Sequence, residues 1–395
     1  MFDPLLLALL TAAIAIGWLL GRRERRRHRH DHARGTRTLS RDYFVGLNFL
    51  LNEQPDQAIE TFTQALEVNS ETIDTHIALG NLFRLRGEAD RAVRIHQNLL
   101  ARPALSTLQS DQVQLELARD FFHLGVLDRA ERLARAVVDG TGDQEMRLAA
   151  RHLLVDLFER EQEWQQALDI AQPQLIRQDE RVQHAAAHWL CELAIIDINQ
   201  GSPGPARRRL KQALSIDEQC VRATWLMADI EHRAGRYRDE IRTLKRIRDQ
   251  DSAFTPLIFE PIRQAFELLD DQPGLKSFLE EQVERTPFVT AMIMLAEQLR
   301  HQQGVEAAAA LVGKQLEQHS SLRGIDYLTS LYTDQAEDDS RDHLTLLKRH
   351  TGQLLEQRPR FRCHHCGLAG DTLYWQCPRC RHWSTLKPIT GLEGE

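Results

Sequence analysis

The chain has 395 residues and a formal net charge of −7, with 57 acidic and 50 basic residues. This acidic balance argues against a nucleic-acid-binding protein, because binding to a phosphate backbone requires a basic surface. The length is sufficient for an extended domain of several units together with small terminal modules.

The first segment of the chain is apolar. The run from Leu5 to Leu20 contains no charged residue, and Trp18 lies where an interfacial aromatic residue is expected. A helix over residues 1–20 would be about 30 Å long, which matches the hydrocarbon core of a bilayer. We therefore predict a transmembrane anchor at residues 1–20. The alternative is a cleavable signal peptide, which requires its basic residues before the apolar run rather than after it.

Residues 21–38 form a basic juxtamembrane linker. They contain eight arginines between Arg22 and Arg37, offset by Glu24 and Asp31. Because basic flanks are retained on the cytoplasmic side, the segment predicts a single-pass protein whose N-terminus lies outside and whose body lies in the cytoplasm. The same arginines are expected to contact anionic lipids of the inner leaflet rather than nucleic acid.

Residues 39–356 repeat a helical motif. A leading residue, usually small, is followed four and seven positions later by further apolar or small residues, which places all three on one helix face. The leading positions are 58, 92, 130, 167, 206 and 240, so the spacing is 34 to 39 residues. Four copies illustrate the pattern: Ala58/Phe62/Ala65, Ala92/His96/Leu99, Ala130/Ala134/Val137 and Ala206/Leu210/Ala213.

Two further positions accompany each leading residue. A glycine five residues earlier is predicted to end the first helix and reverse the chain, as at Gly87, Gly125, Gly201, Gly235 and Gly304. A small residue twelve positions earlier is predicted to pack against the second helix, as at Gly46, Gly80, Ala118, Ala194 and Ala228.

This pattern resembles the tetratricopeptide repeat and predicts an all-α superhelical solenoid of eight or nine hairpins. The alternative, a generic helical bundle, gives no reason for a 34-residue spacing. Later copies are weaker, because Glu240 replaces the small residue and the register near Pro273 is hard to assign. The concave face suits an extended polypeptide, and on that face we predict Asn81 and Arg84 as partner-binding residues.

The C-terminal segment, residues 357–395, carries four cysteines in two CxxC pairs, Cys363, Cys366, Cys377 and Cys380. Two such knuckles ten residues apart predict a ribbon in which four thiolates hold one metal ion, zinc or iron. Disulfides are the alternative, but a cytoplasmic body disfavours them. We expect three aromatic residues to pack over the metal as a small core: Tyr374, Trp375 and Trp383.

We find no nucleophile with a base, no phosphate-binding loop and no metalloprotease motif, so the sequence predicts a protein that is not an enzyme. Cys191 and Cys220, outside the metal set, are expected to be buried thiols. Electron transfer through iron is an alternative. Rubredoxins, however, separate their knuckles by a longer segment and usually have a glycine after the last ligand, where this chain has Arg381.

The order of these three modules, with the segments GNLFRLRGEADRAVRIHQ and TLYWQCPRCRHWSTLKPI, resembles the lipopolysaccharide assembly protein B family of Gram-negative bacteria over essentially the whole chain. The resemblance implies an inner-membrane protein with a periplasmic N-terminus. It also implies a rubredoxin-type iron site at the four cysteines, whereas the chemistry of the residues suits zinc equally.

The resemblance further implies a non-enzymatic adaptor that promotes degradation of the lipid A pathway deacetylase by a membrane-bound AAA+ metalloprotease. On that basis the ribbon is expected to dock on the last helices or on a client. A general scaffold for cell-envelope assembly is the main alternative, because only the identity of the client separates the two. Self-association is left open by the sequence.

Overall fold

The computed structural model describes residues 41–52, 54–68, 73–103, 105–140, 143–171, 174–286, 288–392 and 394. The predicted anchor at residues 1–20 and the predicted linker at residues 21–38 lie outside these ranges. Within them, no helix combines the length and the apolar character that crossing a bilayer requires. The chain divides into two compact units, Met1–Leu157 and Phe158–Glu395.

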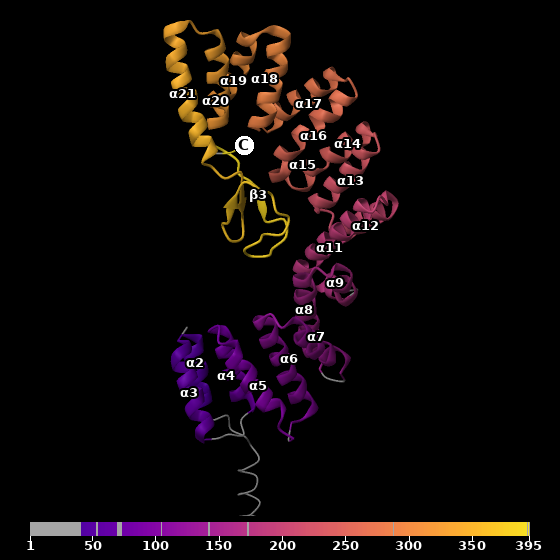
Figure 1. The fold of residues 1–395 in the computed structure, drawn as a ribbon, viewed down its shortest axis with the longest axis vertical. Coiled ribbons are helices and arrows are strands. Elements are labelled where there is room, and N and C mark those ends of the chain that lie inside the picture. The colour runs from indigo at the N-terminus through magenta and orange to yellow at the C-terminus, as the bar shows by residue number, and fades with distance from the viewer. Residues whose placement is uncertain are drawn as a thin grey trace, which may run out of the picture. The chain divides into compact units, whose positions relative to one another are not determined.

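The first unit is built from antiparallel helical hairpins, drawn in indigo to purple in Figure 1. Each hairpin can bury its apolar face only against its neighbours, so the pairs stack in chain order. The helices are α2 (Arg41–Leu51), α3 (Pro55–Val68), α4 (Ile73–Leu85), α5 (Ala89–Leu100), α6 (Thr107–Leu124), α7 (Leu127–Asp139) and α8 (Gln144–Glu161), whose last turn belongs to the second unit.

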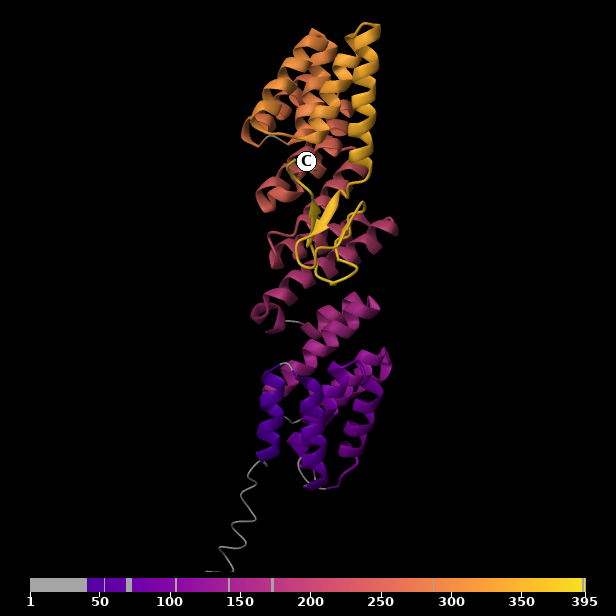
Figure 2. The ribbon, with the colours of Figure 1, turned by 90° about the vertical axis from the view of Figure 1, so that its left-hand side faces the viewer.

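The second unit continues the hairpins and ends in the cysteine ribbon. Helices α18 to α21 each pack on the next, and Figure 2 shows the orange and yellow helices of this part standing side by side. The helices are α9 (Trp164–Ala171), α10 (Gln174–Gln178), α11 (Glu180–Asn199), α12 (Pro203–Ile216), α13 (Val221–Arg233), α14 (Tyr237–Lys245), α15 (Ile247–Gln250), the 3-10 turn η1 (Ser252–Phe254), α16 (Thr255–Leu268), α17 (Gln272–Arg285), α18 (Val289–Gln303), α19 (Val305–Gln318), α20 (Leu322–Gln335) and α21 (Asp338–Glu356).

The described helices form eight hairpins within the two units, in agreement with the predicted eight or nine: α2–α3, α4–α5, α6–α7, α11–α12, α13–α14, α16–α17, α18–α19 and α20–α21. The tetratricopeptide architecture predicted from the repeat is therefore confirmed. The short elements α10, α15 and η1 occupy the connections between hairpins.

The small residues of the repeat allow close helix contact, as predicted. A methyl group at Gly46 would come within 2.6 Å of the Phe62 ring, and one at Gly80 within 2.4 Å of the His96 ring. The leading alanine Ala92 has no exposed surface. Two helices of one hairpin thus approach at a point where only a hydrogen or a methyl group fits.

Seven residues with positive φ mark the turns between helices. The five predicted glycines all have φ between 69° and 96°. At the corresponding place before α9 stands Gln162, with φ of 62°, and before α17 stands Asp270, with φ of 53°. Asp270 assigns the register that the sequence left uncertain, because it makes Leu275 the leading residue of α17.

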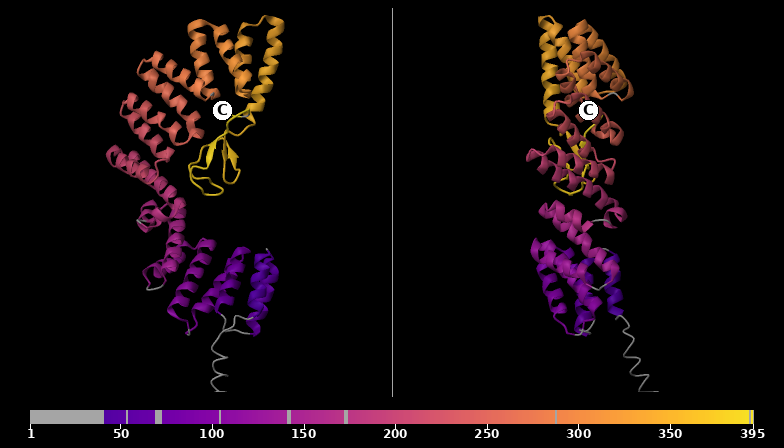
Figure 3. Two further views of the ribbon diagram at one scale, coloured as in Figure 1. Left: turned by 180° about the vertical axis from the view of Figure 1, so that it is seen from behind. Right: turned by 90° about the vertical axis from the view of Figure 1, so that its right-hand side faces the viewer.

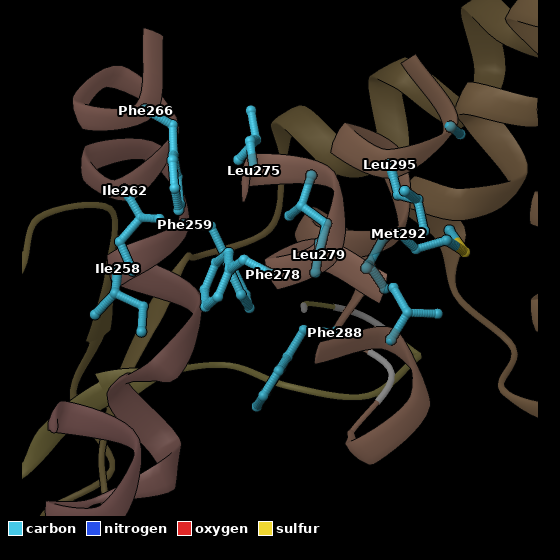
Figure 4. Close-up of a cluster of buried hydrophobic side chains, with 14 of the residues drawn as sticks. Ile258, Phe259, Ile262, Phe266, Leu275, Phe278, Leu279, Phe288, Met292 and Leu295 are labelled. Atoms are coloured by element: carbon cyan, nitrogen blue, oxygen red, sulfur yellow. The ribbon is translucent and has the colours of Figure 1, made fainter. Parts of the chain in front are cut away.

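A large apolar cluster fills the second unit between α16, α17 and α18 (Figure 4). The ring of Phe259 lies 6.2 Å from that of Phe278 and 5.8 Å from that of Phe288, measured between centroids. These aromatic side chains come from α16, from α17 and from the residue that precedes α18, so the cluster joins neighbouring hairpins into one core.

The C-terminal ribbon contains a three-stranded antiparallel sheet with the order β2-β1-β3. Its strands are β1 (Phe361–Cys363), β2 (Ala369–Gly370) and β3 (Leu386–Pro388). Phe361 pairs with both Gly370 and Pro388, which makes β1 the central strand. Figure 3 shows this yellow ribbon beside the helices of the second unit.

Candidate metal centre and its docking surface

The two CxxC knuckles have the same backbone geometry. In the first, the N–H of Gly367 donates to the carbonyl of Cys363 at 3.0 Å, and Gly367 has φ of 75°. In the second, the N–H of Arg381 donates to the carbonyl of Cys377 at 2.8 Å, and Arg381 has φ of 60°. The arginine after the last cysteine therefore adopts the left-handed conformation that a glycine would favour.

The structure brings the four predicted cysteines together. Their sulfur atoms all lie within 4.8 Å of one another, and Cys363–Cys380 and Cys366–Cys377 are each separated by 3.7 Å between sulfurs. Four sulfurs arranged tetrahedrally at about 2.3 Å from one ion are about 3.8 Å apart. The spacing thus fits a four-thiolate metal site and is too long for a disulfide. It fits iron as well as zinc.

The ribbon gives its thiols unequal acidity. Burial alone would raise the pKa of Cys363, but hydrogen bonds with the Thr385 hydroxyl and with the backbone N–H groups of Cys366 and His365 lower that pKa to about 6. Burial and the neighbouring sulfurs raise the pKa of Cys380 to about 12. A metal ion bound by all four thiolates must therefore displace protons, so its affinity falls in acid.

The prediction that three aromatic residues pack over the metal is wrong. The side chains that pack around the four cysteines are different ones, and they include Phe361, Leu386 and Leu368. Tyr374 is half exposed. The two tryptophans instead face the helices, because rings of their size bury more surface there than a ribbon of this size can offer.

Trp383 is the main contact between the ribbon and the helices. Its ring stacks on His188 of α11, with centroids 4.8 Å apart and planes 11° apart. It also meets Trp164 of α9 edge to face at 6.1 Å. Its indole N–H donates to the carboxylate of Glu159 at 3.2 Å, and the Arg222 guanidinium lies 5.8 Å from the ring centroid.

His188 is fully buried beneath the ribbon. Burial, together with the nearby charges of His184 and Arg222, holds the pKa of His188 well below its usual value, so its imidazole is neutral. Its Nε2 lies 2.9 Å from the hydroxyl of Ser384. A neutral histidine therefore supplies both a flat face for the tryptophan and a hydrogen bond to the next ribbon residue.

A second group of contacts holds the other side of the ribbon. Trp375 stacks on Phe254 of η1 at 5.5 Å, and Leu257 of α16 packs against the ribbon core. Lys387 of β3 forms an ion pair with Asp251 at 2.6 Å. Apolar contacts and one partly exposed ion pair thus hold this side of the ribbon against the helices.

The ribbon docks mainly on α9, α11, α13 and η1, at the start and middle of the second unit. The expected docking on the last helices is therefore wrong for most of the interface, and the alternative, docking on a client, stays a prediction. The C-terminal segment also reaches the start of α20, where the N–H of Leu322 donates to the carbonyl of Leu392 at 3.1 Å. Long-range docking of this kind leaves no local pattern in the sequence.

Sequence reasoning missed Glu159 and His188. His188 lies in the alanine-rich run from Ala185 to Leu190, on a helix surface that is otherwise apolar. A polar ring in such a place requires a partner, and this signal could have marked it. Glu159 gave no signal, because glutamate is common near the end of a helix.

Asn81 and Arg84, predicted to bind a partner, lie in a buried polar network of the first unit. Arg84 forms ion pairs with Glu116 and Asp120, each at 2.6 Å, and donates to the amide oxygen of Asn81 at 2.7 Å. Asp120 also lies 2.5 Å from Nδ1 of His96. This network joins α4, α5 and α6, and a role of the two residues in partner binding stays a prediction.

Cys191 and Cys220 are buried, as expected from their apolar surroundings. Their sulfur atoms lie 4.0 Å apart, and neither forms a disulfide. Burial raises the pKa of Cys191 well above its usual value, so this thiol is protonated at neutral pH.

Comparison with known proteins assigns the chain. Lipopolysaccharide assembly protein B of Escherichia coli strain K12 is 34% identical over 391 residues, which are 99% of each chain. The chain belongs to the lipopolysaccharide assembly protein B family. A relative of the same name from Haemophilus influenzae is 32% identical, over 98% of this chain and 99% of the relative. The rubredoxin metal binding domain model matches residues 361–388, and the tetratricopeptide repeat model matches residues 75–106.

Solved structures with tetratricopeptide repeats overlap this member of the lipopolysaccharide assembly protein B family only loosely. A repeat-containing protein from Cytophaga hutchinsonii is 13% identical with a TM-score of 0.39, covering 72% of this chain and 99% of that chain. Yeast Tom70 is 14% identical with a TM-score of 0.32, covering 79% and 76%. The architecture rests on the helices described above.

Proposed function

We propose that this protein is a non-enzymatic adaptor of lipopolysaccharide assembly at the bacterial inner membrane. It promotes degradation of the lipid A pathway deacetylase by a membrane-bound AAA+ metalloprotease. The observation that carries the proposal is the similarity to lipopolysaccharide assembly protein B over 99% of both chains, which includes the repeats and the ribbon.

The arrangement of the second unit supports a holding role. Stacked hairpins offer a long surface for a polypeptide client, and the docked ribbon fixes residues that are far apart in sequence. A membrane anchor at residues 1–20 would raise the local concentration of client and protease, so that weak contacts act together. None of these steps requires catalysis.

A metal ion fits the ribbon as a structural element. Cys363, Cys366, Cys377 and Cys380 would hold it, because their sulfur spacing matches a tetrahedral four-thiolate site. The bound ion would supply cross-linking between two knuckles that have only a small core of their own. In this role the ion keeps Trp375 and Trp383 in position against the helices.

The central experiment follows the half-life of the deacetylase after the protein is depleted from growing cells. The proposal expects the half-life to lengthen several-fold, and a complementing copy should restore it. An unchanged half-life would exclude the adaptor role and favour a general scaffold for envelope assembly.

Electron transfer is a second candidate, because the matching model is described as a rubredoxin metal binding domain. It requires bound iron with a reversible couple. Metal analysis and visible absorption of protein purified without chelators separate the two roles. A colourless, zinc-loaded protein excludes electron transfer and leaves the adaptor role intact.

A further inference from the structure

An apolar pocket of about 480 Å³ lies in the first unit among α5, α6 and α7. Its lining includes the partly buried Leu100 and Leu133 and the buried side chains of Leu117 and Phe121. Its volume is within the range of ligand sites in proteins. Its lining comes from the second helices α5 and α7 as well as from the first helix α6, whereas the predicted partner surface of the repeats is made by first helices alone.

Two exposed arginines of α7, Arg129 and Arg132, line the same pocket. Neither forms an ion pair with another residue in the described part of the chain. The Arg129 guanidinium lies 5.5 Å from the centroid of the Phe121 ring, which holds it over the pocket. In a chain of net charge −7, an apolar pocket bordered by two unneutralised cations selects for a partner that is both apolar and acidic.

We propose that this pocket binds an acidic polypeptide segment of the client. One bulky aliphatic side chain of the segment inserts between Leu100 and Leu133, and neighbouring carboxylates pair with Arg129 and Arg132. The inference rests on the proposed function, which names the lipid A pathway deacetylase as the client.

The spacing of the two arginines favours a polypeptide over a lipid. Arg129 and Arg132 are three residues apart, so they present two separate charges about one helical turn apart. Two carboxylates three or four residues apart on a client helix match this spacing, whereas the headgroup of phosphatidylglycerol offers a single phosphate. Arginine also pairs with carboxylates through two parallel hydrogen bonds, which fixes the orientation of the segment.

The test measures binding of purified deacetylase to the full-length chain in detergent. Arg129→Glu/Arg132→Glu reverses both charges, and Ala101→Trp fills the pocket without changing its charge, because Ala101 is exposed and lines it. Charge reversal replaces two attractive pairs by repulsion, so we expect affinity to fall at least about tenfold. The loss should shrink as salt is raised.

Arg208→Glu/Arg238→Glu is the matched control. Both arginines are exposed in the second unit, line no part of the pocket and form no ion pair among the described residues. The control should bind the deacetylase like the unaltered chain. Circular dichroism of each variant verifies that the fold is retained, which is expected because all the changes are at exposed positions.

The outcomes separate the two proposals. Equal deacetylase affinity for the pocket variants and the control overturns the pocket assignment and leaves the proposed function standing. If the unaltered chain does not bind the deacetylase and its depletion leaves the half-life unchanged, the proposed function fails, and the client named for the pocket fails with it. Binding to phosphatidylglycerol vesicles that is lost in Arg129→Glu/Arg132→Glu, with deacetylase binding unaffected, identifies a lipid site and overturns the inference.

Discussion

Replacing Trp383 by alanine should release the ribbon from the helices without removing a metal ligand. The side chain is 7% exposed and contributes a stack on His188, an edge contact with Trp164 and a hydrogen bond to the carboxylate of Glu159. Each aromatic contact is worth about 0.5–1.5 kcal/mol, and a hydrogen bond to a charged acceptor about 1.5–3 kcal/mol. Truncation of a buried tryptophan typically costs about 3–5 kcal/mol, which agrees with this range.

A loss of about 4 kcal/mol lowers the docking equilibrium constant by about a thousandfold. Amide hydrogen exchange in α11 measures it, because backbone groups beneath the ribbon should lose protection in Trp383→Ala while the metal content is unchanged. Tyr374→Ala is the control in the same ribbon, since that side chain is half exposed and its loss should change stability by less than about 0.5 kcal/mol. Unchanged exchange in α11 of Trp383→Ala would refute the docking energetics argued here.

Three further predictions concern the metal, the hairpin contacts and pH. Serine at any one of the four ribbon cysteines should lower the metal content measured by mass spectrometry and should also speed exchange in α11; unchanged exchange would show that the ribbon docks without its ion. Gly80→Ala should destabilise its hairpin by about 1–3 kcal/mol because the new methyl group meets His96. Gly313→Ala, in open space within α19, should instead stabilise that helix by about 0.5–1 kcal/mol. Hydrogen exchange in α4 and α19 measures both effects. Burial would lower the pKa of His184, but its hydrogen bond with Asp217 raises it above 6.5, while the pKa of Asp217 is lowered below 3.8 despite its burial. Because the pKa of His184 is raised, its protonated form stabilises the fold fully below pH 6.5; because the pKa of Asp217 is lowered, its ionised form stabilises the fold fully above pH 3.8. Asp217→Asn should therefore reduce the urea midpoint most between these two pH values, and progressively less as the pH rises through the raised pKa of His184. An equal reduction at about pH 5.5 and pH 9 would contradict the pairing.

Local features of this chain were predictable, and features that depend on distant contacts were not. The repeat spacing and the turn glycines predicted the hairpins, because the two helices of a hairpin and the turn between them lie within about 40 residues of sequence. The four cysteines gave the metal site for the same reason. Asp270 concealed one repeat, since it adopts positive φ where the pattern calls for glycine, whereas the repeat after Gln162 was still marked by its leading residue Ala167.

The docking of the ribbon could not be predicted by such reasoning. Trp383 could serve equally well as a core residue of the ribbon or as a contact with another surface, and only the position of His188 decides between these roles. The network around Arg84 is similar, because its acidic partners come from a helix more than 30 residues away. Pairings of this range leave no periodicity in the sequence.

The ribbon also has a consequence for synthesis. Trp383 contacts Glu159, 224 residues earlier, and Ser384 contacts His188, 196 residues earlier. At about 5–20 residues per second, the ribosome needs roughly 10–45 s to make the intervening chain, and throughout that time the apolar surface of α9 and α11 has no cover. Repeat proteins normally cover the surface of each unit as its neighbour emerges. Here the docking surface on α9 and α11 is covered only after the last residues of the nascent polypeptide have been made, so we expect this surface to need chaperone protection during synthesis.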